Sequence, residues 1–259
     1  MTVPGVLVHR DAGLLAQAVA ARLVIALVDA QAARDSASLV LTGGGIGTAS
    51  LAELAAAPAR DAIDWRRLDI WWGDERFLPA GDPERNETAA RSALLDSVDA
   101  DPVRLRPMPA SDGPDGNDPE AAAERYADLL RAAARPEDHG PVPSFDVLLL
   151  GVGPDGHVAS VFPESPAGYE TRPVVAVHGA PKPPPTRLTM TLSAINSARE
   201  VWVIAAGPEK GSAVRLALSG AGQMQVPAAG VRGRSRTLWL LDRAAARQLP
   251  PELARAASP

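Results

Sequence analysis

The apolar residues of this chain fall into short runs that alternate with longer segments in which they recur with helical periodicity. Short runs bounded by glycine, proline or charged residues predict buried strands, and they cover residues 6–10, 38–42, 67–72, 145–153, 187–192, 200–207 and 237–242. The periodic segments predict helices at 11–33, 48–57, 86–98, 118–134 and 208–220. Strands that alternate with helices indicate an α/β fold class, with a mostly parallel, twisted sheet covered by helices on both faces.

Length and composition are those of one globular domain. The chain has 259 residues, of which 46% are hydrophobic and 22% are charged, enough to bury a sizeable core. The proline- and glycine-rich stretches at 110–118, 135–144 and 180–185 predict surface loops, and none separates segments of different composition. We therefore expect a single domain over residues 1–259.

The charge balance and the missing residue types exclude several classes of function. A net charge of −5 and a pI of about 5.4 argue against a nucleic-acid partner, although basic residues can still gather around a small anion. The absence of cysteine excludes disulfides, thiolate nucleophiles and cysteine–zinc sites. The chain has neither a His-x-x-x-His pair nor a compact carboxylate cluster, which argues against a metal site.

The N-terminal segment carries no sequence signal for secretion or membrane insertion. No basic segment leads into an apolar stretch at residues 1–13, and the longest early apolar run, 23–28, is too short to span a bilayer. We expect a cytoplasmic protein without a membrane partner.

Chemically distinctive residues follow four of the predicted strands. A glycine-rich turn follows 38–42, Asp-Glu-Arg follows 67–72, Asp-Gly-His follows 145–153 and a lysine follows 200–207. In a parallel α/β sheet the ligand lies beyond the carboxyl ends of the strands, so these groups are expected at one rim. Glycines, a histidine and several cations at that rim indicate a site for a small phosphorylated molecule.

The turn "GGGIGTAS" can bind an anion through its backbone. Residues 43–47 allow conformations in which successive N–H groups converge, and the helix that follows adds its positive end and the hydroxyl of Thr48 or Ser50. The turn lacks the lysine of a P-loop and does not fit G-x-G-x-x-G, so a single phosphate is favoured over a nucleotide. A tight strand-to-helix turn without a ligand is the alternative.

The segment "WWGDERFLP" places three charged residues after the third strand. Arg76 can hold a phosphate with two hydrogen bonds, while Asp74 or Glu75 fixes its orientation or that of a neighbouring loop. A surface ion pair after a buried strand is the alternative interpretation.

His157, in "GPDGHVAS", is the candidate catalytic residue. An imidazole can take a proton from water and return it later, and Asp155 can raise its basicity or fix its tautomer. A histidine that caps a short helix is the alternative, but the place at a strand end beside glycines favours catalysis. The chain contains no G-x-S-x-G segment, which argues against a Ser-His-Asp triad.

Together these segments resemble the 6-phosphogluconolactonase family. "LTGGGIGTAS" is similar to its phosphate loop, "WWGDERFLP" to its G-D-E-R-x-x-P segment, and "LLLGVGPDGHVASVFP" to its L-G-x-G-x-D-G-H-x-A-S-x-F-P signature. "RLTMTL", "AAGPEK" and "VPAAGV" followed by "LWLLD" are similar to later blocks, in the same order. One departure lies at residues 44–48, where the family commonly has Gly-Gly-Ser-Thr-Pro and this chain has Gly-Gly-Ile-Gly-Thr.

The resemblance implies a Rossmann-like fold of the sugar-phosphate isomerase/deaminase type. It also implies hydrolysis of 6-phospho-D-glucono-1,5-lactone to 6-phosphogluconate in the oxidative pentose phosphate pathway, without a metal or organic cofactor. The partner is then a small phosphorylated sugar lactone, and we expect a monomer or a weak homo-oligomer. His157 and Asp155 are the expected catalytic residues. The residues expected to bind the substrate or its phosphate are Gly43, Gly44, Gly45, Gly47, Thr48, Asp74, Glu75, Arg76, Gly153, Arg187 and Lys210.

Two other functions compete with this interpretation. An amino-sugar-phosphate deaminase/isomerase shares the L-G-x-G-x-D-G-H motif but continues D-G-H-x-A-F-N-E-P, and this chain has Val161 and Phe162 where Asn and Glu stand there. An apolar pair cannot transfer protons, which disfavours the deaminase. A non-catalytic sugar-phosphate-binding domain is the second alternative, although the chain before residue 39 lacks a basic recognition helix.

Overall fold

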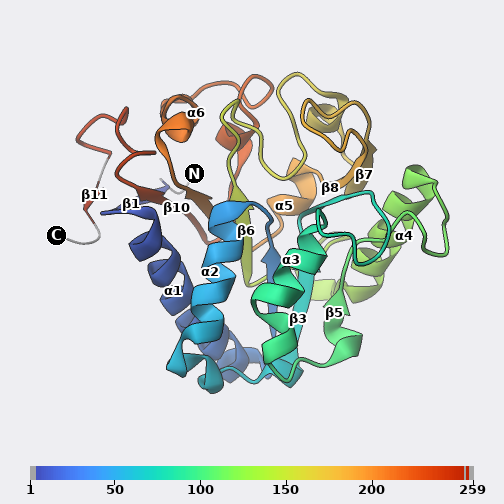
Figure 1. Cartoon of the computed structure of the whole chain (residues 1–259). Helices are drawn as coiled ribbons and strands as arrows, with labels where there is room; N and C mark the ends of the chain where they lie inside the picture. The colour runs from blue at the N-terminus through green and yellow to red at the C-terminus, as the bar shows by residue number, and fades with distance from the viewer. Residues whose placement is uncertain (1–3, 254, 257–259) are drawn as a thin grey trace.

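The computed structural model describes residues 4–253 and 255–256, which form a sheet of eight parallel strands and a smaller sheet beside it (Figure 1). In spatial order the strands of the main sheet are β11 (Arg255–Ala256), β1 (Gly5–His9), β10 (Arg236–Asp242), β9 (Glu200–Ala205), β6 (Val147–Gly151), β2 (Ala37–Leu41), β3 (Leu68–Trp72) and β5 (Leu105–Arg106). All neighbouring pairs run parallel. The predicted parallel α/β sheet is confirmed.

Three short strands form a separate antiparallel sheet. They are β4 (Asp74–Arg76), β8 (Arg187–Met190) and β7 (Val174–Val177), with β8 in the centre. The predicted strand at 187–192 is present as β8, but it lies in this antiparallel sheet and not in the parallel one. Residues 178–186 between β7 and β8 are too few for a helical crossover, so the two strands pair as an antiparallel hairpin instead.

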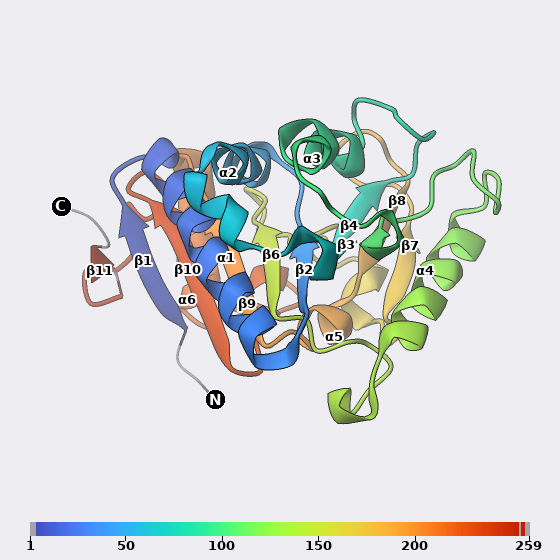
Figure 2. The same ribbon diagram turned by 90° about the horizontal axis from the view of Figure 1, so that it is seen from below.

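Helices cover both faces of the main sheet. Figure 2 shows α1 (Ala12–Arg34) and α2 (Gly45–Ala56) side by side on one face, with α6 (Gly211–Leu218) on the other. Helix α4 (Pro119–Ala133) packs against β7 and β8 of the small sheet. The two remaining α-helices of the described residues are α3 (Asn86–Ala93) and α5 (Leu192–Ile195).

Helix α1 is 23 residues long and, by length and composition, apolar enough to cross a membrane. One face of the helix packs into the interior of the fold: Leu15, Val19, Leu23 and Leu27 are fully buried in the main core cluster, whereas Ile25 is 63% exposed. The helix begins after Asp11, whose carboxylate accepts a hydrogen bond from the backbone N–H of Leu14. In this structure α1 is a core helix of the α/β layer.

The parallel strands bring four loops to one edge of the sheet, at the top in Figure 1. These loops follow β2, β3, β6 and β9 in the chain. Because β2, β3, β6 and β9 lie in the middle of the sheet, their carboxyl ends are close together. This edge is therefore where the predicted site residues converge.

Candidate active site

A cavity of about 260 Å³ lies at this edge and brings together residues from all four loops and from the small sheet. Of the residues expected to form the site, those that line it are Gly43, Gly44, Asp74, Arg76, Gly153, His157, Arg187 and Lys210. Thr48 and Gly45 line an adjoining cavity of about 530 Å³, which shares Gly44 and Arg76 with the first. Asp155, Glu75 and Gly47 are not among the residues that line this cavity, and their contacts are described below.

The glycine turn connects β2 to α2 beside the cavity. Gly44 is the N-cap of α2 and has a φ of 81°, a conformation that favours glycine. The first turn of the helix closes through the Thr48 N–H, which donates to the Gly44 carbonyl at 3.0 Å. Gly47 packs on the end of β2, where a Cβ would lie 2.9 Å from the Thr42 carbonyl oxygen. This geometry directs the positive end of the helix toward the cavity and gives Gly47 a packing role.

His157 and Asp155 form a hydrogen-bonded pair in the loop after β6. The Nδ1 atom of His157 lies 2.5 Å from Oδ1 of Asp155, and the ring centroid lies 4.6 Å from that of Phe162. Partial burial raises the pKa of the Asp155 carboxyl, but its bonds to His157 outweigh this effect and hold the pKa at about 2. The ionised carboxylate fixes Nδ1 as the bonded nitrogen and leaves Nε2 free for proton transfer.

Gly153 provides the space that this pair occupies. A Cβ on Gly153 would overlap both the imidazole of His157 and the carboxylate of Asp155. The Gly153 N–H also donates to the His157 carbonyl at 2.9 Å, which closes the turn on itself. The space taken by the His157 and Asp155 side chains therefore requires glycine at this position.

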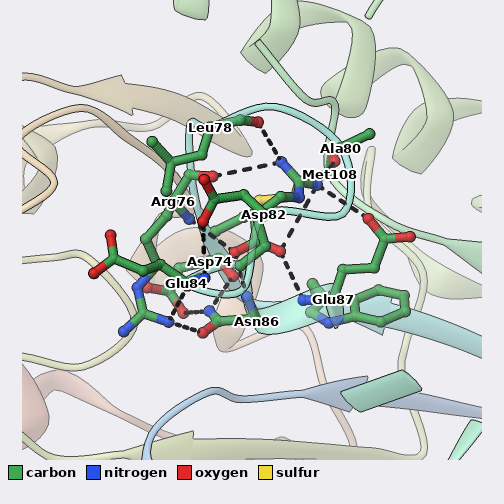
Figure 3. Close-up of polar contacts among 12 residues, drawn as sticks. Asp74, Arg76, Leu78, Ala80, Asp82, Glu84, Asn86, Glu87 and Met108 are labelled. Carbon is green, nitrogen blue, oxygen red and sulfur yellow. Dashed lines mark hydrogen bonds and ion pairs between the residues drawn. The ribbon is translucent and has the colours of Figure 1, made fainter. Parts of the chain in front are cut away.

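Arg76 reaches the cavity from β4, and its guanidinium is held by its own loop. Its Nη1 donates to the Glu84 carbonyl at 3.1 Å and to Oδ1 of Asn86 (Figure 3). Asn86 also donates from Nδ2 to the Asp74 carbonyl at 2.9 Å. Asn86 lines the cavity and was missed in the sequence, where it looked like the first residue of a predicted helix.

Glu75 holds the loop that carries Arg76 through hydrogen bonds to its backbone. It is fully buried, and its carboxylate accepts hydrogen bonds from the backbone N–H groups of Arg76, Asn86 and Glu87 at 2.6–2.9 Å. Burial raises the pKa of Glu75 to about 7, against the lowering effect of the Arg85 guanidinium 3.8 Å away. Glu75 therefore positions the loop that carries Arg76, rather than lining the cavity itself.

Arg187 enters from β8, directly opposite Arg76 in the β4–β8 pairing. Its guanidinium is buried and donates to the carbonyls of Pro184 and Lys182 at 3.2 and 2.9 Å. Burial lowers the pKa of Arg187; the Asp74 carboxylate opposes this effect, and the Arg76 charge adds to it. Arg187 thus shapes the proline-rich loop while it adds positive charge to the cavity.

Two lysines complete the positive lining. Lys210 follows β9, and burial is the main cause that lowers the pKa of its ammonium group. Lys182 lies in the proline-rich loop, which the sequence pattern assigned to the surface, and this residue was missed. The sequence did not indicate that Lys182 reaches the cavity. The path of its loop over the cavity depends on the hairpin of β7 and β8, which the sequence pattern did not predict.

Asp74 links the His157 loop to the small sheet. Its Oδ2 accepts a 2.7 Å hydrogen bond from the hydroxyl of Ser160, and both side chains are buried. The Ser160 N–H donates to the Thr189 hydroxyl of β8 at 3.1 Å. Asp74 therefore lines the cavity as the anchor of a buried polar connection between these loops.

The arrangement can bind a small anion and move a proton beside it. Arg76, Arg187, Lys182 and Lys210 supply positive charge around one cavity, and His157 faces the same space. Within residues 4–253 and 255–256, no group of three histidine, aspartate or glutamate side chains is placed to hold a metal ion.

Known proteins resemble this chain over nearly its whole length. A family model described as glucosamine-6-phosphate isomerases/6-phosphogluconolactonase matches residues 10–239. A protein named 6-phosphogluconolactonase from Streptomyces coelicolor is 66% identical over 96% of this chain and 96% of its own length. One of the same name from Mycobacterium tuberculosis is 52% identical over 93% of this chain and 96% of its own.

Solved structures show the same fold. The 6-phosphogluconolactonase of Trypanosoma brucei superimposes with a TM-score of 0.82 at 31% identity, over 95% of this chain and 99% of its own. A monomeric glucosamine-6-phosphate deaminase aligns with a TM-score of 0.78 at 22% identity, which supports the fold alone. From the family match and the full-length relatives, this chain belongs to the glucosamine-6-phosphate isomerase/6-phosphogluconolactonase family.

Proposed function

We propose that this chain hydrolyses 6-phospho-D-glucono-1,5-lactone to 6-phosphogluconate, a step of the oxidative pentose phosphate pathway. The observation that carries the proposal is that His157, hydrogen-bonded to Asp155, lines one small cavity together with four cationic side chains. The name 6-phosphogluconolactonase, borne by a relative 66% identical over nearly the full chain, supports the same reaction. A cytoplasmic location and a monomeric or weakly associated state stay predictions.

In the proposed mechanism His157 acts as general base. Its Nε2 takes a proton from water as the water oxygen bonds to the lactone carbonyl carbon. The bond from that carbon to the ring oxygen then breaks, and the imidazolium returns the proton to the departing oxygen. The Asp155 carboxylate stabilises the transient imidazolium through Nδ1. Such proton transfer contributes about 10²–10⁴-fold to a rate.

The phosphate end of the substrate is assigned to the glycine turn and the cations. Backbone N–H groups at the start of α2 and the guanidiniums of Arg76 and Arg187 can bind the phosphate oxygens. Lys182 and Lys210 add charge from the other loops. An anchored phosphate holds the carbonyl beside His157, which lowers the entropic part of the barrier.

The deaminase alternative lacks its acid–base groups. Val161 and Phe162 occupy the positions where the deaminase motif has polar residues, and both are buried in a small apolar cluster. Their side chains can neither accept nor donate the protons that ring opening and isomerisation require.

The test is acid release from freshly prepared lactone in a pH-stat, measured against spontaneous ring opening. The wild-type chain is expected to accelerate release, and His157→Ala is expected to lose about 10²–10⁴-fold in kcat while its Kd for 6-phosphogluconate changes little. His139→Ala, in an exposed loop, is the matched control. Wild-type protein that binds 6-phosphogluconate without accelerating hydrolysis would be a non-catalytic binder, and the proposal would be wrong.

A further inference from the structure

Asn86 lies where the Arg76 loop meets the glycine turn. It is 4% exposed, it is the first residue of α3, and its side chain lines both the 260 Å³ cavity and the adjoining one. Figure 3 shows its side chain in polar contact with Asp74 and Arg76. Its surroundings assign it a role that neither the motifs nor the proposed mechanism includes.

Both ends of the Asn86 amide are already engaged by the protein. Oδ1 accepts a hydrogen bond from Nη1 of Arg76, and Nδ2 donates to the Asp74 carbonyl. The first bond involves a charged donor, the stronger class of hydrogen bond. Because both polar atoms of the amide already bond to protein groups, and one of these groups is the Arg76 guanidinium, the contacts support a role for Asn86 through Arg76.

The same amide packs directly on the glycine turn. A Cβ built on Gly43 would overlap the Asn86 side chain, whose Oδ1, Cγ and Nδ2 are the three nearest atoms. Gly43 has no positive φ that would require glycine, so the side-chain amide of Asn86 explains the need for glycine there. The amide therefore sets the spacing between the glycine turn and the Arg76 guanidinium.

Asn86 is itself fixed by its backbone. Its N–H donates to Oε1 of Glu75 at 2.6 Å, and the next N–H, that of Glu87, donates to Oε2 at 2.9 Å. The Glu75 carboxylate thus caps α3, whose N-cap residue Arg85 makes no side-chain cap bond. Because the Glu75 carboxylate fixes the backbone of Asn86, the Asn86 side chain can keep its position when a ligand binds to Arg76.

We propose that Asn86 is the positioning residue for phosphate recognition: it locks the Arg76 guanidinium at a fixed distance from the Gly43 turn so that both grip one phosphate. The inference rests on the proposed function, because it concerns how the phosphorylated lactone is held. It goes beyond that function by naming the residue that couples two separate phosphate-binding elements.

A double-mutant cycle on kcat/KM for the phosphorylated lactone tests the coupling. Asn86→Ala should reduce kcat/KM by about 10- to 100-fold when Arg76 is present, the range for a hydrogen bond to a charged group. In an Arg76→Ala background the same change should cost less than about twofold, since its target is gone. An equal loss in both backgrounds would show a general structural role and would overturn the inference.

A packing experiment gives a readout that does not depend on activity. Gly43→Ala should lower the melting temperature of the wild-type chain, because the new methyl group displaces the Asn86 amide. In an Asn86→Ala background Gly43→Ala should lower it much less. Equal shifts in the two backgrounds would contradict the contact on which the inference depends.

Asp112→Ala is the matched control for loop mobility. Asp112 accepts a 2.8 Å hydrogen bond from the Ala80 N–H and so tethers the same loop without contacting Arg76. Its loss should leave kcat/KM within about twofold of wild type, whereas a loss like that of Asn86→Ala would overturn the specific role of Asn86. A wild-type chain with no lactonase activity would contradict the proposed function, while the melting experiment would still decide the Asn86–Gly43 contact.

Discussion

Replacement of Arg85 by alanine is expected to destabilise the fold by about 3–5 kcal/mol. The Arg85 side chain is fully buried, and it donates to the carbonyls of Leu78 and Met108 at 3.2 and 2.8 Å and to the Glu87 carboxylate at 3.1 Å. It also lies 3.8 Å from Glu75. Its removal leaves carbonyl groups without a donor. Where Glu75 is ionised, it also leaves that buried carboxylate without a cation, and the unpaired charge is then the larger cost.

The loss should depend on pH because Glu75 titrates. Burial raises the pKa of Glu75 from 4.5 to about 7, and Arg85 is the largest opposing influence, so the variant raises this pKa further. A folded-state pKa above the unfolded value means that the folded chain holds a proton that the unfolded chain releases. Stability then falls as pH rises from about 4.5 through the folded-state pKa. The deficit of Arg85→Ala should therefore be larger at pH 8 than at pH 5.

Urea unfolding at pH 5 and pH 8 measures both effects. Arg91→Ala is the matched control, because Arg91 pairs with the same Glu87 at 3.0 Å but is 40% exposed, and its loss should cost less than about 1 kcal/mol. A cost for Arg85→Ala as small as that of Arg91→Ala, or a deficit that shrinks at pH 8, would refute the reasoning.

Two further predictions concern the catalytic loop. Asp155→Asn should lower kcat at least about tenfold, because the imidazolium of His157 loses its carboxylate partner. Calorimetry should show that the Kd for 6-phosphogluconate changes little. An unaltered kcat would remove Asp155 from the mechanism. Gly153→Ala should abolish most turnover in the acid-release assay, since its methyl group overlaps the His157–Asp155 pair, whereas Gly140→Ala, with open space around it, should behave as wild type. Full activity of Gly153→Ala would contradict the arrangement of the pair.

The sequence alone predicted the edge of the sheet at which the site would form. Buried parallel strands are strongly patterned, and their carboxyl ends must share an edge, so the convergence of Gly43, Arg76, His157 and Lys210 followed from strand prediction and the ligand rule for α/β sheets. That expectation needed no knowledge of side-chain contacts. The structure confirms the parallel sheet and places these four residues around one cavity.

Residues whose position depends on the small sheet could not be predicted. Strands β4 and β7 have three and four residues, too short for an alternating pattern to stand out. Without them nothing indicated that Lys182 would reach the cavity or that Asn86 would pack on Gly43. The sequence also left open whether Asp74 or Glu75 orients Arg76; in the structure Asp74 bonds to Ser160, and Glu75 binds backbone N–H groups.

The pairing of β4 with β8 places two arginines, Arg76 and Arg187, directly opposite each other on neighbouring strands, and both line the cavity. Like charges opposed in a sheet repel, so the free protein carries a small local penalty that an anion between them removes. Phosphate should therefore bind the folded state and raise the free energy of unfolding by about 2.7 kcal/mol at a concentration a hundred times its Kd. The melting temperature should be higher in phosphate than in chloride at equal ionic strength. This comparison therefore shows whether the cavity is accessible to an anion and binds it.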